Sequence, residues 1–180
     1  TATWTGTPGQ GKTIVVGSKN FTEEFIIAEM YAAMLEDAGY TVEKKLNLGG
    51  TPVLQAALVS EQIDLYPEYT GTGLLTVLKL PVDTDMQRVY NTVSSEYKKQ
   101  FNLVWLAQTA MNDTQALAMP ADKAAAMNIK TVSDLVAKAA DLTIIGPPEF
   151  EEREDGIPGM KKVYGDFQLK KFLPVDPGLR

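Results

Sequence analysis

The sequence of 180 residues contains no cysteine and no histidine. Their absence excludes disulfides, thiol nucleophiles and imidazole bases, and it removes the usual ligands of zinc. No apolar run approaches the roughly 20 residues that span a bilayer. The net charge of -6 argues against nucleic acid and anionic membrane surfaces as partners, because both favour Lys and Arg clusters. We therefore expect no metal, no cofactor and no catalytic residue.

The composition is that of a folded chain, because 44% of the residues are hydrophobic. The length suits one ordinary domain or two small ones. No basic segment followed by an apolar segment opens the sequence, so we expect any signal peptide to have been removed already.

The most informative stretch runs from Asp64 to Thr72 (DLYPEYTGT). It predicts a short strand at 63–66 and a helix that begins near Thr70 or Gly71. Tyr69 offers an aromatic face that attracts organic cations. The Thr70 and Thr72 hydroxyls, together with the free N–H groups of the helix start, form a candidate anion site. The stretch thus suits a small zwitterion, although a plain turn with Thr caps is the alternative.

Strands and helices alternate along the rest of the chain, which predicts parallel sheets flanked by helices. The alternation restarts after about Gln108. We therefore expect a flexible leader at 1–12, a first α/β lobe at 13–107 and a second at 108–180. Further expected features are strands at 103–107 and 114–119, helix caps at Thr22 and Thr51, and a capping box at Thr131 and Asp134.

A match to the Walker A pattern runs from Gly6 to Thr13. That motif needs a strand before the loop and a helix after it. Here a strand is expected to follow the loop, beginning at Thr13. Nucleotide binding is therefore a minor alternative.

Several segments occur in an order that resembles one known family. They are GSKNFTE at 17–23, LGGT at 48–51, DLYPEYTGT at 64–72, NDTQALA at 112–118 and DPGLR at 176–180. Together they resemble the substrate-binding proteins of ABC importers for osmoprotectants such as glycine betaine, choline and carnitine. The resemblance implies a two-lobed periplasmic-binding-protein fold of type II, in which the protein closes on its ligand and delivers it to a membrane permease.

The resemblance also implies roles for particular residues. Tyr69 becomes one wall of an aromatic cage around a quaternary ammonium group. Lys19 and Thr72 become donors to the carboxylate of the ligand, and Arg153 becomes the donor from the second lobe. The alternatives are a solvated Lys19 and an Arg153 that pairs with the acids around it.

Two departures from the family pattern are visible. Gln115 stands where a cage Tyr is expected, so it is either a polar pocket residue or an ordinary strand residue. Family members also continue past Arg180, so we expect an incomplete second lobe whose sheet edge is buried by self-association or by a missing segment. The sequence thus predicts an extracytoplasmic receptor for a small osmolyte that performs no reaction. A receptor for a different polar solute is the alternative.

Overall fold

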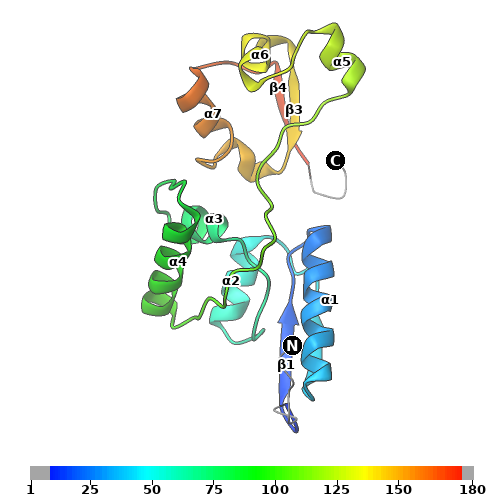
Figure 1. Ribbon diagram of the computed structural model, residues 1–180, viewed down its shortest axis with the longest axis vertical. Helices are drawn as coiled ribbons and strands as arrows, with labels where there is room; N and C mark the ends of the chain where they lie inside the picture. The colour runs from blue at the N-terminus through cyan, green and yellow to red at the C-terminus, as the bar shows by residue number, and fades with distance from the viewer. Residues whose placement is uncertain (1–8, 176–180) are drawn as a thin grey trace. The chain divides into compact units, whose positions relative to one another are not determined.

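The computed structural model describes residues 9–175, which form two compact units that meet between Gln108 and Thr109 (Figure 1). The first three residues of the Walker A match and the first eight of the expected leader lie outside the described residues. From Gly9 to Lys12 the chain forms a turn, and strand β1 (Thr13–Gly17) follows directly. A strand in the place where a phosphate-binding loop needs a helix contradicts the nucleotide-binding alternative.

The sheet of the first unit pairs β1 with β2 (Thr41–Lys45) in parallel. Helix α1 (Thr22–Asp37) connects the two strands and lies along β1 (Figure 1). Ala28 and Ala32 are fully buried on this helix, because their small side chains allow close packing. The chain then reverses at Gly39, where φ is 90°, a backbone conformation that favours glycine.

The expected strand at 63–66 is reduced to a single parallel bridge between Val16 and Leu65. Beside the bridge, the side chain of Asp64 accepts a hydrogen bond from the N–H of Val15 at 2.7 Å. Pro67 then removes a donor from the backbone. A longer ladder is prevented because a side chain and a proline stand where backbone pairing would continue.

Helix α2 (Thr51–Val59) precedes this bridge, and α3 (Thr70–Thr72) follows it. The start predicted near Thr70 is confirmed, but α3 continues as a π-helix (Gly73–Val77). The expected caps are wrong. Thr22 and Thr51 lie inside the first turns of their helices, and the capping positions are Phe21 and Gly50, which make no side-chain cap bond.

Helix α4 (Met86–Phe101) covers the π-helix and builds the larger core cluster of the first unit. Its inner face contributes Val89, Val93 and Tyr97. The strand expected at 103–107 does not form. Instead, Trp105 packs edge-on against the Tyr97 ring at 5.3 Å between centroids. The apolar residues around Trp105 thus pack against α4 and do not form a strand.

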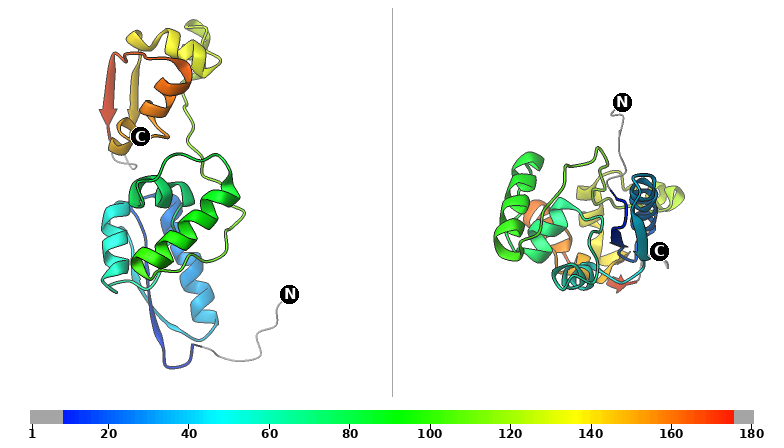
Figure 2. Two further views of the ribbon diagram at one scale, coloured as in Figure 1. Left: turned by 90° about the vertical axis from the view of Figure 1, so that its left-hand side faces the viewer. Right: turned by 90° about the horizontal axis from the view of Figure 1, so that it is seen from below.

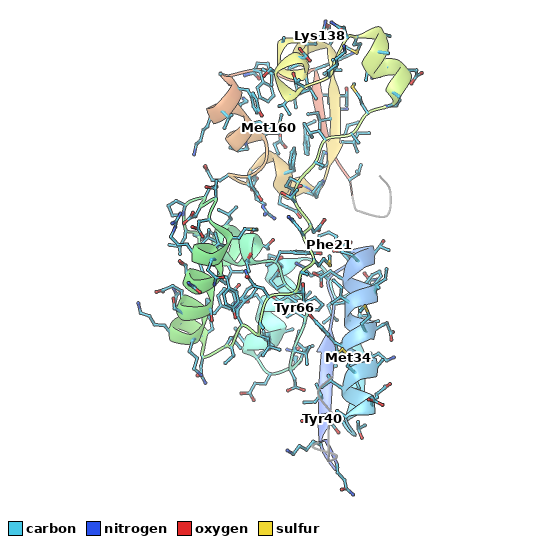
Figure 3. All side chains as sticks on the ribbon, in the orientation of Figure 1. Phe21, Met34, Tyr40, Tyr66, Lys138 and Met160 are labelled. Atoms are coloured by element: carbon cyan, nitrogen blue, oxygen red, sulfur yellow. The ribbon has the colours of Figure 1, made fainter. Side chains whose placement is uncertain are left out.

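The second unit has its own parallel pair, β3 (Thr143–Gly146) and β4 (Lys171–Pro174). Helix α7 (Ile157–Tyr164) connects the two strands, which run side by side in Figure 2. A separate core joins the sheet, α7 and two short 3-10 helices, Ala139–Asp141 and Pro148–Glu151. Met160 of α7 packs against this core (Figure 3).

Two short helices, α5 (Ala121–Ala126) and α6 (Val132–Ala137), complete the second unit. The capping box predicted at Thr131 and Asp134 is confirmed, since both reciprocal hydrogen bonds are present. The strand predicted at 114–119 is wrong. The segment is irregular, and residues 114–118 are exposed.

Candidate functional site

The site of the first unit begins where β1 ends. Ser18 and Lys19 follow the strand directly and are 0% and 1% exposed. The Ser18 hydroxyl accepts a hydrogen bond from the N–H of Asn47 at 3.0 Å. The alternative of a solvated Lys19 is therefore wrong, and its buried ammonium requires compensating charge.

Two buried carboxylates supply that charge. The Lys19 Nζ lies 2.5 Å from Oε1 of Glu68 and 3.3 Å from Oε1 of Glu24. The side chains of Glu24 and Glu68 are 0% and 5% exposed. Water screens such pairs little, so the three groups form a tightly coupled ionic cluster.

Glu68 is the centre of this cluster. One carboxylate oxygen accepts from the Lys19 ammonium and from the N–H of Tyr69 at 2.7 Å. The other accepts from the Tyr66 hydroxyl at 3.1 Å and the Thr51 hydroxyl at 3.4 Å. Four donors from four positions of the chain thus fix one carboxylate, and they connect α2, the end of β1 and the start of α3.

Tyr69 lies between this cluster and the surface. Its ring is half-buried, with the Lys19 Nζ 4.7 Å from the centroid. Its hydroxyl donates to Oε1 of Glu23 at 3.0 Å. Phe21, labelled with Tyr66 in Figure 3, places a second ring 5.7 Å from the same ammonium. Lys19 is thus a cation of the protein itself that lies over the Tyr69 ring, and contact of this ring with a ligand cation stays a prediction.

Burial and charge alter the acidity of the cluster. Burial, and to a smaller degree the neighbouring Glu68 carboxylate, raise the pKa of Glu24 to about 7, although Lys19 opposes the change. Burial first and then Glu68 raise the pKa of Tyr66 above its ordinary value, so its hydroxyl stays a donor. Glu24 thus keeps its proton to a higher pH than an ordinary glutamic acid does.

The two threonines of the predicted anion site occupy α3 itself. Thr72 is 7% exposed, and Thr70 is half-buried. Both lie within three residues of Tyr69. Their contact with a ligand carboxylate stays a prediction.

The predicted residues of the second unit lie in different surroundings. Arg153 forms a two-pronged pair with Asp155, at 2.8 Å from Nε to Oδ1 and 2.7 Å from Nη2 to Oδ2. The alternative that Arg153 pairs with a neighbouring acid is confirmed. Gln115 is exposed and belongs to no strand, which corrects its expected place in a strand. The role of either residue toward a ligand stays a prediction.

Sequence reasoning missed Glu68 and Glu24. The available signal was the position of Glu68 directly before Tyr69, on a segment that also meets the end of the first strand.

Two open hollows mark the surface of the first unit. One is lined by Pro52, Val53 and Ala56 of α2, and the other by Ile26 and Met30 of α1, with their neighbours. Neither hollow contains a predicted ligand residue. Among residues 9–175, no helix is both long and apolar enough to cross a membrane, and no acidic cluster is arranged to hold a metal ion.

Parallel α/β sheets bind ligands beyond the carboxyl ends of their strands, and the polar cluster lies at such an end, after β1. Residues 12–176 match the family described as the substrate-binding domain of the ABC-type glycine betaine transport system. The chain belongs to this family, and the resemblance drawn from its sequence motifs is confirmed.

Three relatives are similar to the chain over most of its length. The chain is 35% identical over 180 residues to a glycine-betaine-binding protein of Pseudomonas aeruginosa and 31% identical over 158 residues to the glycine betaine-binding protein YehZ of Escherichia coli. It is 32% identical over 170 residues to the ergothioneine transport permease/ergothioneine binding protein EgtU of Helicobacter pylori. These alignments cover 94%, 84% and 94% of this chain, but only 57%, 52% and 30% of the respective relatives.

Solved structures support the fold. Apo YehZ from Escherichia coli matches with a TM-score of 0.61 at 29% identity, over 93% of this chain and 63% of that one. A glycine betaine/carnitine/choline ABC transporter structure matches with a TM-score of 0.65 at 24% identity, over 92% and 62%. The predicted α/β class with parallel sheets of the periplasmic-binding-protein kind is confirmed.

Proposed function

We propose that the chain is part of an extracytoplasmic receptor that captures a small quaternary-ammonium or zwitterionic solute for an ABC importer. Family membership over residues 12–176 supports the transport role. In this proposal a membrane permease is the partner that receives the solute. The proposal covers the whole protein, whereas this chain spans about half the length of its glycine-betaine-binding relatives.

The observation that carries the ligand class is the surroundings of Tyr69. The hydroxyl of this half-buried ring donates to Glu23, and an ammonium that pairs with Glu24 and Glu68 rests 4.7 Å from the ring centroid. An electron-rich ring face and nearby carboxylates both favour a cation. The same surroundings disfavour a ligand that is only an anion.

We infer that the protein catalyses no reaction. The Lys19 ammonium and the Arg153 guanidinium are both engaged in ion pairs, and the buried Ser18 hydroxyl accepts a hydrogen bond from a backbone N–H. A serine nucleophile needs a base within hydrogen-bond reach. A chain without histidine has no imidazole to supply one.

A second candidate is a receptor for a different polar solute. Gln115 stands in place of the cage Tyr that the resemblance implies, and a relative at 32% identity is named for ergothioneine. An exposed amide side chain offers hydrogen bonds that a purely apolar cage lacks. A larger or more polar solute would make use of such a group.

Titration calorimetry with glycine betaine, choline, ergothioneine and ATP tests both candidates. The proposal expects heat from glycine betaine or choline and none from ATP. Binding of ergothioneine alone would favour the second candidate. Binding of ATP, or of none of the four compounds, would contradict the proposed function. Light scattering of the same sample tests the separate prediction that the chain self-associates.

A further inference from the structure

The ligand contact that the resemblance implies for Lys19 differs from the contacts that Lys19 makes in the structure. The resemblance implies that its ammonium donates to a ligand carboxylate. In the structure, however, the ammonium is 1% exposed and is shared between Glu68 and Glu24. A ligand carboxylate would have to compete with two acids that are already in place.

The charge of the cluster follows from its members. Lys19 contributes one positive charge, and Glu24 and Glu68 contribute up to two negative charges. The cluster is therefore neutral or negative, depending on the protonation of Glu24. Because the groups are buried, their field reaches the adjacent ring of Tyr69 with little screening.

Glu68 contributes a negative charge to the cluster and also fixes the position of the Lys19 ammonium relative to the Tyr69 ring. Its Oε1 joins the Lys19 ammonium to the backbone N–H of Tyr69, so a single oxygen positions the cation relative to the ring. Tyr66 and Thr51 hold the other oxygen, which keeps the carboxylate from turning away.

From these contacts we propose that Glu68 is a positioning and specificity-determining residue. It holds the Lys19 ammonium against the Tyr69 ring, and it cancels the positive charge that would otherwise attract a carboxylate. This half of the site then receives the cationic end of the solute. The selectivity part of the proposal rests on the proposed function, whereas the positioning part does not.

The positioning part is tested without any ligand. In NMR spectra of the unliganded protein, the Lys19 side-chain protons should be shifted upfield by the rings of Tyr69 and Phe21. Glu68→Gln should reduce that shift, and Tyr69→Leu should remove most of it. An unshifted Lys19 in the wild-type protein would overturn the positioning role. This measurement on the wild type decides the matter even if a variant fails to fold.

The selectivity part is tested by the ratio of the glycine betaine and choline affinities. Removing one negative charge close to the ring should shift this ratio about tenfold toward the carboxylate-bearing betaine in Glu68→Gln. Glu29→Gln is the matched control, because it makes the same change of charge on the exposed surface of α1, where Glu29 pairs with Lys44. A shift no larger than that of the control would overturn the selectivity role.

A second variant separates charge from structure. Tyr66→Phe removes one hydrogen bond to Glu68 but leaves every charge unchanged. The affinity ratio should change less than it does in Glu68→Gln, because the charge remains and Thr51 still holds the same oxygen. A shift as large as that of Glu68→Gln would overturn the charge argument. If the wild type binds neither solute, the proposed function fails, and the Lys19 spectrum still decides the positioning role.

Discussion

The two units use charged side chains in opposite ways. In the first unit, Lys19, Glu24 and Glu68 are almost entirely buried and contact one another beneath an aromatic ring. In the second unit, Arg153 and Asp155 are 18% and 29% exposed and pair within one loop. Burial makes the first cluster sensitive to any loss of a member, whereas solvent can replace a lost partner in the second.

This difference predicts where each unit can be damaged. A buried ion that loses its partner cannot be rehydrated without opening the structure. An ion near the surface regains water at once. The predictions below test this contrast in order of decreasing effect.

The largest effect is expected from Lys19→Met. The change leaves Glu24 and Glu68 side by side without a cation, which should destabilise the first unit by about 3–5 kcal/mol. Urea unfolding followed by the fluorescence of Trp105 reports on this unit, because Trp105 packs against its core. Lys44→Met breaks the exposed pair with Glu29 and should leave the midpoint nearly unchanged. Equal effects of the two changes would contradict a buried cluster.

The next effect concerns pH and Glu24. Its pKa is raised to about 7 in the folded protein from 4.5, so the folded state binds the proton more tightly than the unfolded state does. The stabilisation is therefore present below pH 4.5 and is lost as the pH rises through 7. The loss is at most about 3 kcal/mol between pH 4.5 and pH 8.

Glu24→Gln tests this linkage, because the amide stays neutral at every pH. The stability of the variant relative to the wild type should rise as the pH increases from 5 to 8. Urea unfolding at several pH values, again followed at Trp105, measures the difference. A difference that stays constant with pH would show that Glu24 does not titrate in this range.

A smaller effect, on binding, is expected from Tyr69. Tyr69→Ala removes the ring face and should cost about 1–2 kcal/mol of affinity for a quaternary ammonium solute. Tyr69→Phe keeps the ring and loses only the hydrogen bond from the hydroxyl to Glu23. It should therefore bind with nearly the wild-type affinity. Calorimetry showing equal losses in both variants would assign the role to the hydroxyl.

Sequence reasoning predicted the regular elements well where periodicity and connection length decide the structure. The parallel order of β1 and β2, the start of α3 near Thr70 and the capping box at Thr131 all follow from local patterns. It failed where tertiary packing decides. The apolar run around Trp105 covers a helix instead of forming a strand, because α4 offers an aromatic partner in Tyr97.

The candidate site was predicted only in part for a related reason. Tyr69 could be selected because it follows the end of a predicted strand, and Lys19 because the family resemblance implies its role. The role of Glu68 depends on contacts with Lys19 and Thr51, which lie 49 and 17 residues away in the sequence. A local pattern contains no information on such pairs. It also cannot show that an acid in a first helical turn, such as Glu24, is turned inward.

The smallest effect is expected in the second unit, from Asp155→Asn. The amide keeps the shape of the carboxylate but loses its charge, so Arg153 loses an ionic partner and turns to water or to another nearby acid. Because both side chains are partly exposed, the cost should be about 1 kcal/mol or less. Hydrogen exchange of the β3 and β4 amides measures this cost, since the sequence places no tryptophan after Trp105. A loss as large as that from Lys19→Met would show that the two units do not differ in the way their burial implies.

The same variant also tests the ligand role proposed for Arg153. If Asp155 restrains a guanidinium that is meant for a ligand carboxylate, releasing it should tighten the binding of glycine betaine and leave choline unaffected.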